Sequence, residues 1–97
     1  MNFYGCPDED LHVSMDRILP VIDYITSEVC GRTAIIISTT EGCDILGDGL
    51  AVDLRIVDLP TDVSTSYYFA LNYALRKLCD VVYNPTYIHV EYNPSDY

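Results

Sequence analysis

Apolar residues recur with two different periods along this chain, and the first period predicts a helix. From about residue 15 to 29, one helical face is marked by apolar residues three or four positions apart: Ile18, Ile22, Ile25 and Val29. Pro20 fits only near the first turn, because proline has no backbone N–H to donate. We therefore expect this helix to start at Asp16 or Arg17 and to end at Gly31, since glycine commonly follows a helix.

The second period, strict alternation, predicts strands. "TAIIIS", residues 33–38, is continuously apolar and β-branched, as in a central strand. "LAVDLRI", residues 50–56, alternates, so that one face carries Leu50, Val52, Leu54 and Ile56 and the other carries Ala51, Asp53 and Arg55. The segment between the two strands, "TTEGCDILGDG", is rich in turn residues and is expected to be a loop.

The C-terminal half repeats the helix-then-strands order. After Pro60, Ser64 is a candidate cap for a helix running to about Leu78. The side chains expected to face inward from this helix are Ala70, Ala74, Leu75 and Leu78. "DVVYN", residues 80–84, and "YIHVEY", residues 87–92, are predicted strands, joined by a tight hairpin connection at "NPT".

The order helix, strand, strand, helix, strand, strand predicts one α+β domain over residues 1–97. We expect a small, mostly antiparallel sheet with the helices packed on one face. Residues 1–14, which contain Pro7 and an acidic cluster, are expected to be irregular.

Composition narrows the classes of function. The chain has 15 acidic and 5 basic residues and a net charge of −10, which disfavours contact with nucleic acid or a membrane surface. No apolar stretch is long enough for a membrane span. "MNFYGCPDED" has neither a basic start nor an apolar core, so we expect no signal peptide and synthesis in the cytoplasm.

Cysteines and tyrosines leave alternatives open. The four cysteines, which form no C-x-x-C pair, are Cys6, Cys30, Cys43 and Cys79. Free thiols are expected, with Cys30 and Cys79 as small core residues, although a disulfide remains open if the protein acts outside a cell. Tyrosines that are candidates for a contact surface are Tyr67, Tyr68, Tyr87, Tyr92 and Tyr97. The simpler alternative is that they cover partly exposed faces of helices and strands.

"ITS…IIISTTEG", "GLAVDLRIVDLP" and "IHVEYNP" resemble segments of the D-Ala-D-Ala carboxypeptidase and phage endolysin peptidase family. The resemblance covers about residues 15–94 and implies the fold that the family shares with the N-terminal signalling domain of Hedgehog proteins. It also implies a zinc ion held by two histidines and one aspartate, with a bound water that a glutamate deprotonates. Three protein ligands leave one position open for this water, and the zinc ion lowers the pKa of the water.

Compared position by position, this sequence keeps part of the family's site. Asp53 matches the zinc aspartate and His89 matches the histidine of the last strand. Leu46 stands seven residues before the aspartate, where the family has its other histidine. Asn84 stands at the place of the glutamate base, and Tyr87 replaces the histidine two residues before the zinc histidine.

Other residues could refill the site. The predicted loop that contains Leu46 also carries three chemically competent zinc ligands, which are Cys43, Asp44 and Asp48. Glu91 shares a strand face with the histidine and is a candidate base, but a solvated strand charge is the preferred interpretation. Asp53 could equally form an ion pair with Arg55. The predicted binding pocket consists of Asp53, Arg55, Asn84, Tyr87, His89 and Glu91. His12 lies outside the matched region and is interpreted as a surface residue.

The resemblance implies a degenerate, non-catalytic peptidase-like domain that acts through binding or as a structural component. Its expected partner is a protein or a cell-wall peptide, and the phage likeness suggests association with a virion. No cofactor is expected, except zinc if the site is rearranged. The alternative is an active zinc peptidase that cleaves peptidoglycan stem peptides. A disulfide-linked or redox structural protein is a third class, resting on the cysteines alone.

Overall fold

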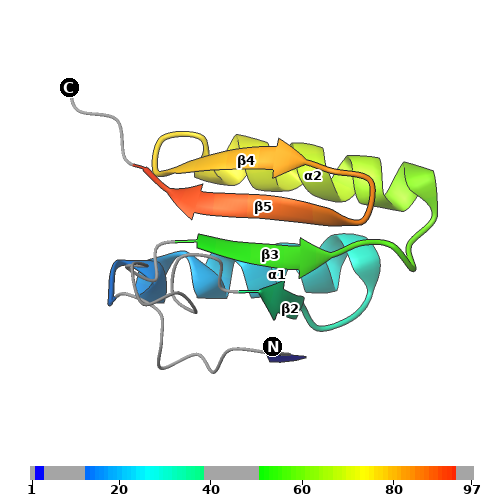
Figure 1. Cartoon of the computed structure of the whole chain (residues 1–97), viewed down its shortest axis with the longest axis horizontal. Coiled ribbons are helices and arrows are strands. Elements are labelled where there is room, and N and C mark those ends of the chain that lie inside the picture. Colours follow the sequence, from blue (N-terminus) through cyan, green and yellow to red (C-terminus); the bar gives the residue numbers. More distant parts are fainter. Residues whose placement is uncertain (1, 4–12, 39–50, 94–97) are drawn as a thin grey trace.

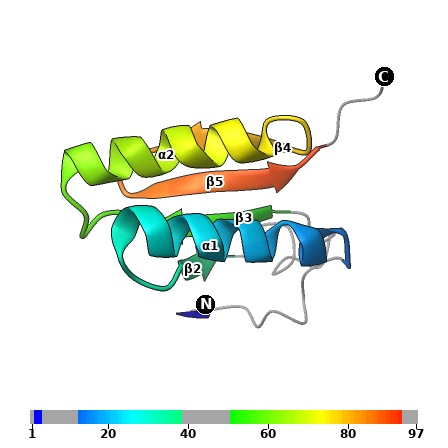
Figure 2. The same ribbon diagram turned by 180° about the vertical axis from the view of Figure 1, so that it is seen from behind.

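A four-stranded antiparallel sheet with two helices on one face forms the framework of the domain (Figures 1 and 2). The structure, a computed structural model, describes residues 2–3, 13–38 and 51–93. The strand order is β1-β2-β3-β5-β4, in which β1 (Asn2–Phe3) adds to β2 (Ile35–Ser38) in parallel. The predicted α+β class, with a mostly antiparallel sheet covered on one side, is confirmed.

The N-terminal part differs from the prediction at two points. Within the segment 1–14, predicted to be irregular, Asn2 and Phe3 pair with Ile35 and Ile36 as β1. Two residues are too short for a periodic pattern, so only the pairing reveals this strand. A 3₁₀-helix, η2 (Val13–Arg17), begins within the same predicted irregular segment.

The first helix, α1 (Leu19–Cys30), starts later than predicted. The predicted start at Asp16 or Arg17 is wrong for the α-helix because these residues belong to the preceding 3₁₀ turn. Pro20 lies in the first turn, where its missing N–H costs no helical hydrogen bond. The predicted end is confirmed: Gly31 has a left-handed φ of 67°, and its N–H donates to the carbonyl of Ser27.

The second helix, α2 (Thr61–Leu75), starts earlier and ends earlier than predicted. Ser64 is not its cap, because Pro60 precedes the first turn and the Ser64 hydroxyl instead donates to the carbonyl of Thr61 at 3.1 Å. The buried positions of this helix are Ser64, Tyr67, Leu71 and Leu75. Ala74, predicted to face inward, is exposed, because it lies one position before the buried residue Leu75.

The remaining three strands complete the sheet on the other side of β2. These are β3 (Ala51–Arg55), β4 (Cys79–Tyr83) and β5 (Tyr87–Tyr92), with β5 between the other two. The predicted strand 80–84 is shifted by one residue, because Cys79 opposite Tyr92 opens the ladder and Asn84 lies in the turn.

One core lies between the sheet and the helices. The sheet contributes buried side chains at alternate positions, including Val52, Leu54, Ile88 and Val90. The helices contribute Ile18, Ile22, Tyr67, Leu71 and Leu75. At about 25 cal/mol per Å² of buried apolar surface, this core is the main stabilising term of so small a domain. Among the described helices, none is long and apolar enough to cross a membrane.

Candidate functional site

The sheet face opposite the helices carries the polar residues that the sequence singled out. Because side chains alternate along a strand, burial of Val52, Leu54 and Val90 on the helix side places Asp53 and His89 on the other side. The register sets Asp53 of β3 directly opposite His89 of β5. β3 and β5, which are separated in the chain by α2 and β4, therefore bring together residues 36 positions apart.

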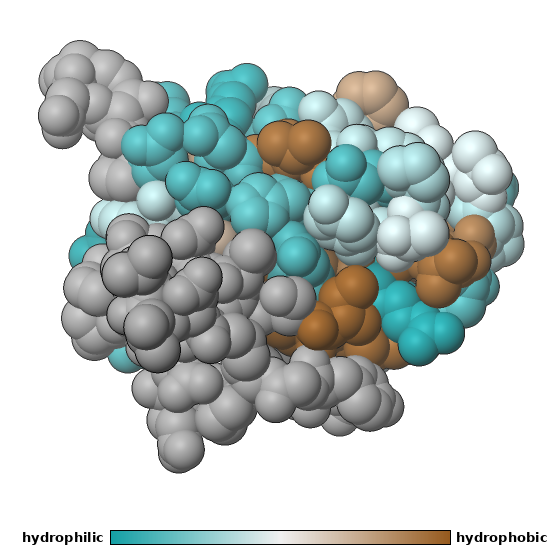
Figure 3. Space-filling view, viewed as in Figure 1, coloured by the Kyte–Doolittle hydropathy of each residue, from teal (hydrophilic) through white to brown (hydrophobic). Residues whose placement is uncertain are grey.

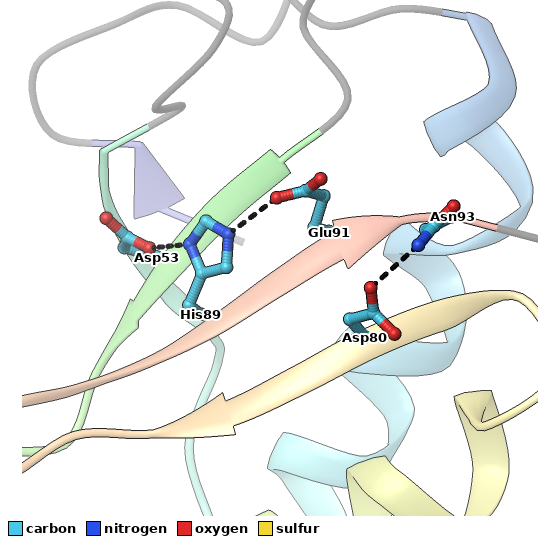
Figure 4. A network of polar contacts seen from close by, with 5 residues as sticks. All are labelled: Asp53, Asp80, His89, Glu91 and Asn93. Carbon is cyan, nitrogen blue, oxygen red and sulfur yellow. Dashed lines mark hydrogen bonds and ion pairs between the residues drawn. The ribbon is translucent and has the colours of Figure 1, made fainter.

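The imidazole of His89 lies between two carboxylates (Figure 4). Nδ1 is 2.7 Å from Oδ1 of Asp53, and Nε2 is 3.2 Å from Oε1 of Glu91. A carboxylate only accepts hydrogen bonds, so both ring nitrogens donate when both contacts are made. That arrangement favours the imidazolium form.

The electrostatics of the site support this charge state. Burial, the largest single influence, lowers the pKa of His89, but the hydrogen bonds and negative charges of Asp53 and Glu91 together outweigh it and raise that pKa. The side chain of Asp53 is 14% exposed and that of Glu91 is 45% exposed. The Asp53 contact is therefore the better shielded and the shorter of the two.

Glu91, interpreted as a solvated strand charge, has an exposed side chain that also takes part in the contacts of His89. Its carboxylate bonds to His89, two residues earlier on the same strand face. Glu91 also lies opposite Asp80 of β4, whose Oδ2 accepts a 2.8 Å hydrogen bond from the amide of Asn93 (Figure 4). Strand alternation alone places Glu91 beside His89, but only the rotamers show the bond.

Arg55 takes part in a second charged group at the other end of β3. Its Nε is 3.8 Å from Oδ1 of Asp58. Arg32 donates to Oδ2 of Asp58 at 2.5 Å and to the carbonyl of Arg55 at 2.9 Å. The hydrogen bond from Arg32 is the main reason that the pKa of Asp58 is lowered. Sequence spacing gives no sign of Arg32 and Asp58, which lie 26 positions apart.

Asn84 and Tyr87 lie at the hairpin that joins β4 to β5. The N–H of Asn84 donates to the carbonyl of Tyr87 at 2.9 Å and so closes the turn. Tyr87 is half-buried and lies opposite Arg55 across the β3–β5 ladder, next to the Asp53–His89 pair. Both residues thus lie near the two matched positions, and their predicted part in a pocket stays a prediction.

Both ring nitrogens of His89 contact carboxylate oxygens in this structure. Within residues 2–3, 13–38 and 51–93, no three His, Cys, Asp or Glu side chains form a group that could hold a metal ion. The candidate positions Cys43, Asp44, Leu46 and Asp48 lie outside the described residues, as do His12 and Tyr97.

The two described cysteines are free thiols with core character. Burial raises the pKa of Cys30, and burial raises that of Cys79 to about 11. A raised pKa keeps a thiol protonated and weakens it both as nucleophile and as metal ligand. The expectation of free thiols at these two positions is confirmed, while Cys6 and Cys43 lie outside the described residues.

An open groove of about 510 Å³ lies elsewhere, between α2 and β4. It is lined by Thr61, Thr65, Tyr68 and Phe69 of the helix and by residues 81–83 of the strand. Tyr68, a predicted contact residue, lines it, whereas Tyr67 is 1% exposed and belongs to the core, which corrects its assignment to a contact surface. Phe69, which the sequence patterns did not single out, is 61% exposed. Phe69 does not share the three- or four-residue spacing of the buried positions of α2, and this could have identified it as an exposed aromatic residue.

The chain was compared with known proteins at three levels. No family model matches it, and no curated protein or solved structure is significantly similar to it. The class of protein that fold and site define is therefore a small α+β domain with a carboxylate-bound histidine on the open face of its sheet.

Proposed function

We propose that this domain works without catalysis, as a binding or structural component, and that it is a degenerate relative of the D-Ala-D-Ala peptidases with their Hedgehog-type fold. The observation that carries the proposal is the double hydrogen bond of His89 to Asp53 and Glu91. The two residues that match a metal site in sequence, Asp53 and His89, hydrogen-bond to each other, which supports a structural role for the pair.

The replaced positions support the same proposal. Hydrolysis by a zinc-bound water needs a carboxylate base within hydrogen-bond reach of that water. Asn84, at the place of the glutamate, has an amide side chain that takes up no proton, and its backbone serves the hairpin. Tyr87 contributes no imidazole. The proposed partner is a protein or a cell-wall peptide, in keeping with an acidic domain whose phage likeness points to a virion.

The test is a joint measurement of zinc and hydrolysis on the purified chain. We expect no stoichiometric zinc after purification without chelator. We also expect no cleavage of D-Ala-D-Ala dipeptide or purified peptidoglycan, with or without added zinc. His89→Ala tests the candidate ligand, and His12→Ala is the matched control, since the chain has two histidines.

Zinc-dependent cleavage that disappears in His89→Ala but persists in His12→Ala would establish the alternative, an active peptidase with a rearranged metal site. A gain-of-function arm sharpens the result. The triple change Leu46→His, Asn84→Glu, Tyr87→His restores the family's residue types together, because ligands and base act as a unit. We expect each single restoration to leave the chain inactive.

A further inference from the structure

Strand β4 is an edge of the sheet in the described part of the chain, with β5 as its neighbour on one side. Two hydrogen bonds show which peptide groups of β4 are hydrogen-bonded to β5. The N–H of Asn84 donates to Tyr87, and at the other end the N–H of Asn93 donates to the carbonyl of Leu78. Bonded and non-bonded pairs alternate along an antiparallel ladder. The even-numbered residues of β4 therefore bond to β5.

The odd-numbered residues then turn their peptide groups outward. Val81 and Tyr83 direct N–H and C=O away from β5, while Val82 shares a bonded pair with His89. Natural sheets usually protect such an edge with proline, a bulge or several charges. β4, "CDVVY", has one charged residue, Asp80, and a continuous register with β5. Figure 3 shows hydrophobic surface interrupting the hydrophilic face over β4, and Val82 is 48% exposed.

The groove lies directly along this edge, on the helix side. Tyr68 forms the aromatic floor of the groove. The centroid of the Tyr68 ring is 5.3 Å from the ring centroid of Phe69 and 5.8 Å from that of Tyr83, which it meets edge-on. The Tyr83 hydroxyl is anchored to Ser64 at 3.0 Å. A strand added to β4 would point every second side chain over this aromatic surface, because side chains alternate in a strand. The intervening side chains would lie beside Asp80 and Val82.

The negative charge of the chain indicates which kind of partner could bind at β4. The chain carries −10, and two of its exposed carboxylates are Asp62, in the first turn of α2, and Asp80 of β4. A second copy of the chain would bring the same charge to the interface, which opposes pairing of two β4 edges. A basic partner would instead gain long-range attraction and favourable cross-strand pairs.

We propose that β4 and the groove beside it bind an extended segment of a basic partner protein, added antiparallel as a further strand. Apolar side chains of that segment lie on Tyr68 and Phe69, and its lysine or arginine side chains lie on the face of Asp80. Backbone bonds to Val81 and Tyr83 supply the pairing, and the alternating pockets supply selectivity. The groove lies on the helix side of the sheet, whereas Asp80 shares the open face with His89 and Glu91. The backbone pairing at Val81 and Tyr83 does not involve His89, so the proposal is tested independently of whether the domain hydrolyses peptides.

The probe is the peptide acetyl-Lys-Val-Lys-Val-Lys-Val-amide, titrated onto the full chain. We expect saturable binding, together with slowed hydrogen exchange at the amides of Val81 and Tyr83. The amide of Val82, already bonded within the sheet, should be unchanged. N-methylation of the valine amides should abolish binding, whereas N-methylation of the lysine amides should preserve it, because only the former face β4 in an antiparallel addition.

Two variants form a matched pair on the same helix. Phe69→Ala should weaken binding roughly tenfold, the loss typical of truncating a buried interface aromatic. Tyr73→Ala removes an aromatic that is 72% exposed and outside the groove, and it should leave affinity unchanged. Both positions are exposed in the free chain, so neither variant should impair folding.

Three results would overturn the proposal. Equal affinity for the peptide with Glu in place of each Lys would eliminate the basic partner. Peptide binding without exchange protection at Val81 and Tyr83 would eliminate strand addition. Concentration-dependent dimerisation that protects the same two amides without peptide would show that a second copy occupies the edge.

Discussion

At residue 89, an imidazole with a side chain 22% exposed lies between Asp53 and Glu91. Burial alone would favour its neutral form, and the two carboxylates reverse that preference. The charge of His89 is thus linked to folding, because the unfolded chain does not hold these carboxylates beside it.

The linkage predicts a pH dependence with a definite sign. The pKa of His89 is raised on folding, so its stabilisation is complete below about pH 6.5, the ordinary value, and is lost as pH rises through the higher folded-state pKa. His89→Ala should cost on the order of 1–3 kcal/mol at low pH and less at alkaline pH. Urea unfolding followed by circular dichroism measures this, since the chain has no tryptophan.

Asp53→Asn and Glu91→Gln separate the two contacts. Asp53 is closer to the ring and better shielded, so its change should remove more of the pH-dependent stability. An equal loss of pH-dependent stability in both variants would contradict this ranking. A difference in the free energy of unfolding between wild type and His89→Ala that stays constant across pH would contradict the linkage.

A second residue-scale prediction concerns the buried hydroxyls of Thr26 and Tyr67. Thr26 Oγ1 donates its single proton to the carbonyl of Ile22 at 2.7 Å, so the Tyr67 hydroxyl, 2.5 Å away, donates to Thr26. Thr26→Val would leave the Tyr67 hydroxyl buried without an acceptor, at a cost of about 1–3 kcal/mol. Tyr67→Phe removes that donor and should cost less, about 0.5–1.5 kcal/mol.

The order of these two costs is the decisive comparison, measured by urea unfolding. If Tyr67→Phe proved the more damaging, the assigned direction of the bond would be wrong. The double variant should be less destabilised than the sum of the singles, because both remove the same bond.

The amino-acid pattern predicts which residues share the site, but it does not predict their bonding. Alternation along residues 50–56 and 87–92 is sufficient to put Asp53 and His89 on the polar faces of their strands. Whether the two polar faces coincide depends on strand register. In the sheet, the register places Asp53 directly opposite His89, although a helix lies between the two strands in the sequence. The Glu91 contact depends on a rotamer that no spacing encodes.

At the scale of elements, the end of α1 is set by one backbone conformation. Gly31 has φ 67°, which an L side chain adopts only with strain, and a Cβ there would have nothing within 4 Å. Gly31→Ala should therefore destabilise the fold by about 1–2 kcal/mol through the backbone alone. Gly31→Asn should cost less, because asparagine tolerates this conformation. Thermal or urea unfolding checks both, and equal costs would point to a steric clash instead.

Helix boundaries show where local patterns stop being informative. The apolar spacing of residues 18–29 identifies α1, and Gly31 identifies its end, but the 3₁₀ turn before Leu19 has the same apolar spacing. For α2, Ser64 resembles a cap, yet it is buried against Tyr83 as a core residue. Tertiary contact thus overrides the local preference that the sequence expresses.

At the scale of the whole molecule, net charge opposes the compact state. The charge of −10 produces self-repulsion that salt screens. We expect sodium chloride to raise the melting temperature by several degrees. Glu28→Lys should also raise the melting temperature and reduce its response to salt. This change reduces the magnitude of the net charge from 10 to 8 (−10 + 2 = −8) and removes an acid from the last turn of α1.

Asp62→Lys is the matched control. It makes the same change in net charge but removes an acid from the first turn of α2, where it is favourable. It should therefore be less stable than Glu28→Lys by about 0.6–2 kcal/mol, the sum of two helix-end effects. Identical stabilities would mean that net charge alone determines the response.

The position of β5 between β3 and β4 also governs the order in which the fold can assemble. β5 forms a local hairpin with β4 across a short turn, whereas its pairing with β3 encloses the whole of α2. Contacts close in sequence lose less chain entropy on closure and form sooner. The hairpin is thus the natural early structure, and docking of β3 onto it is the slower event. That late step creates the Asp53–His89 pair, so this contact reports completion of folding rather than its onset.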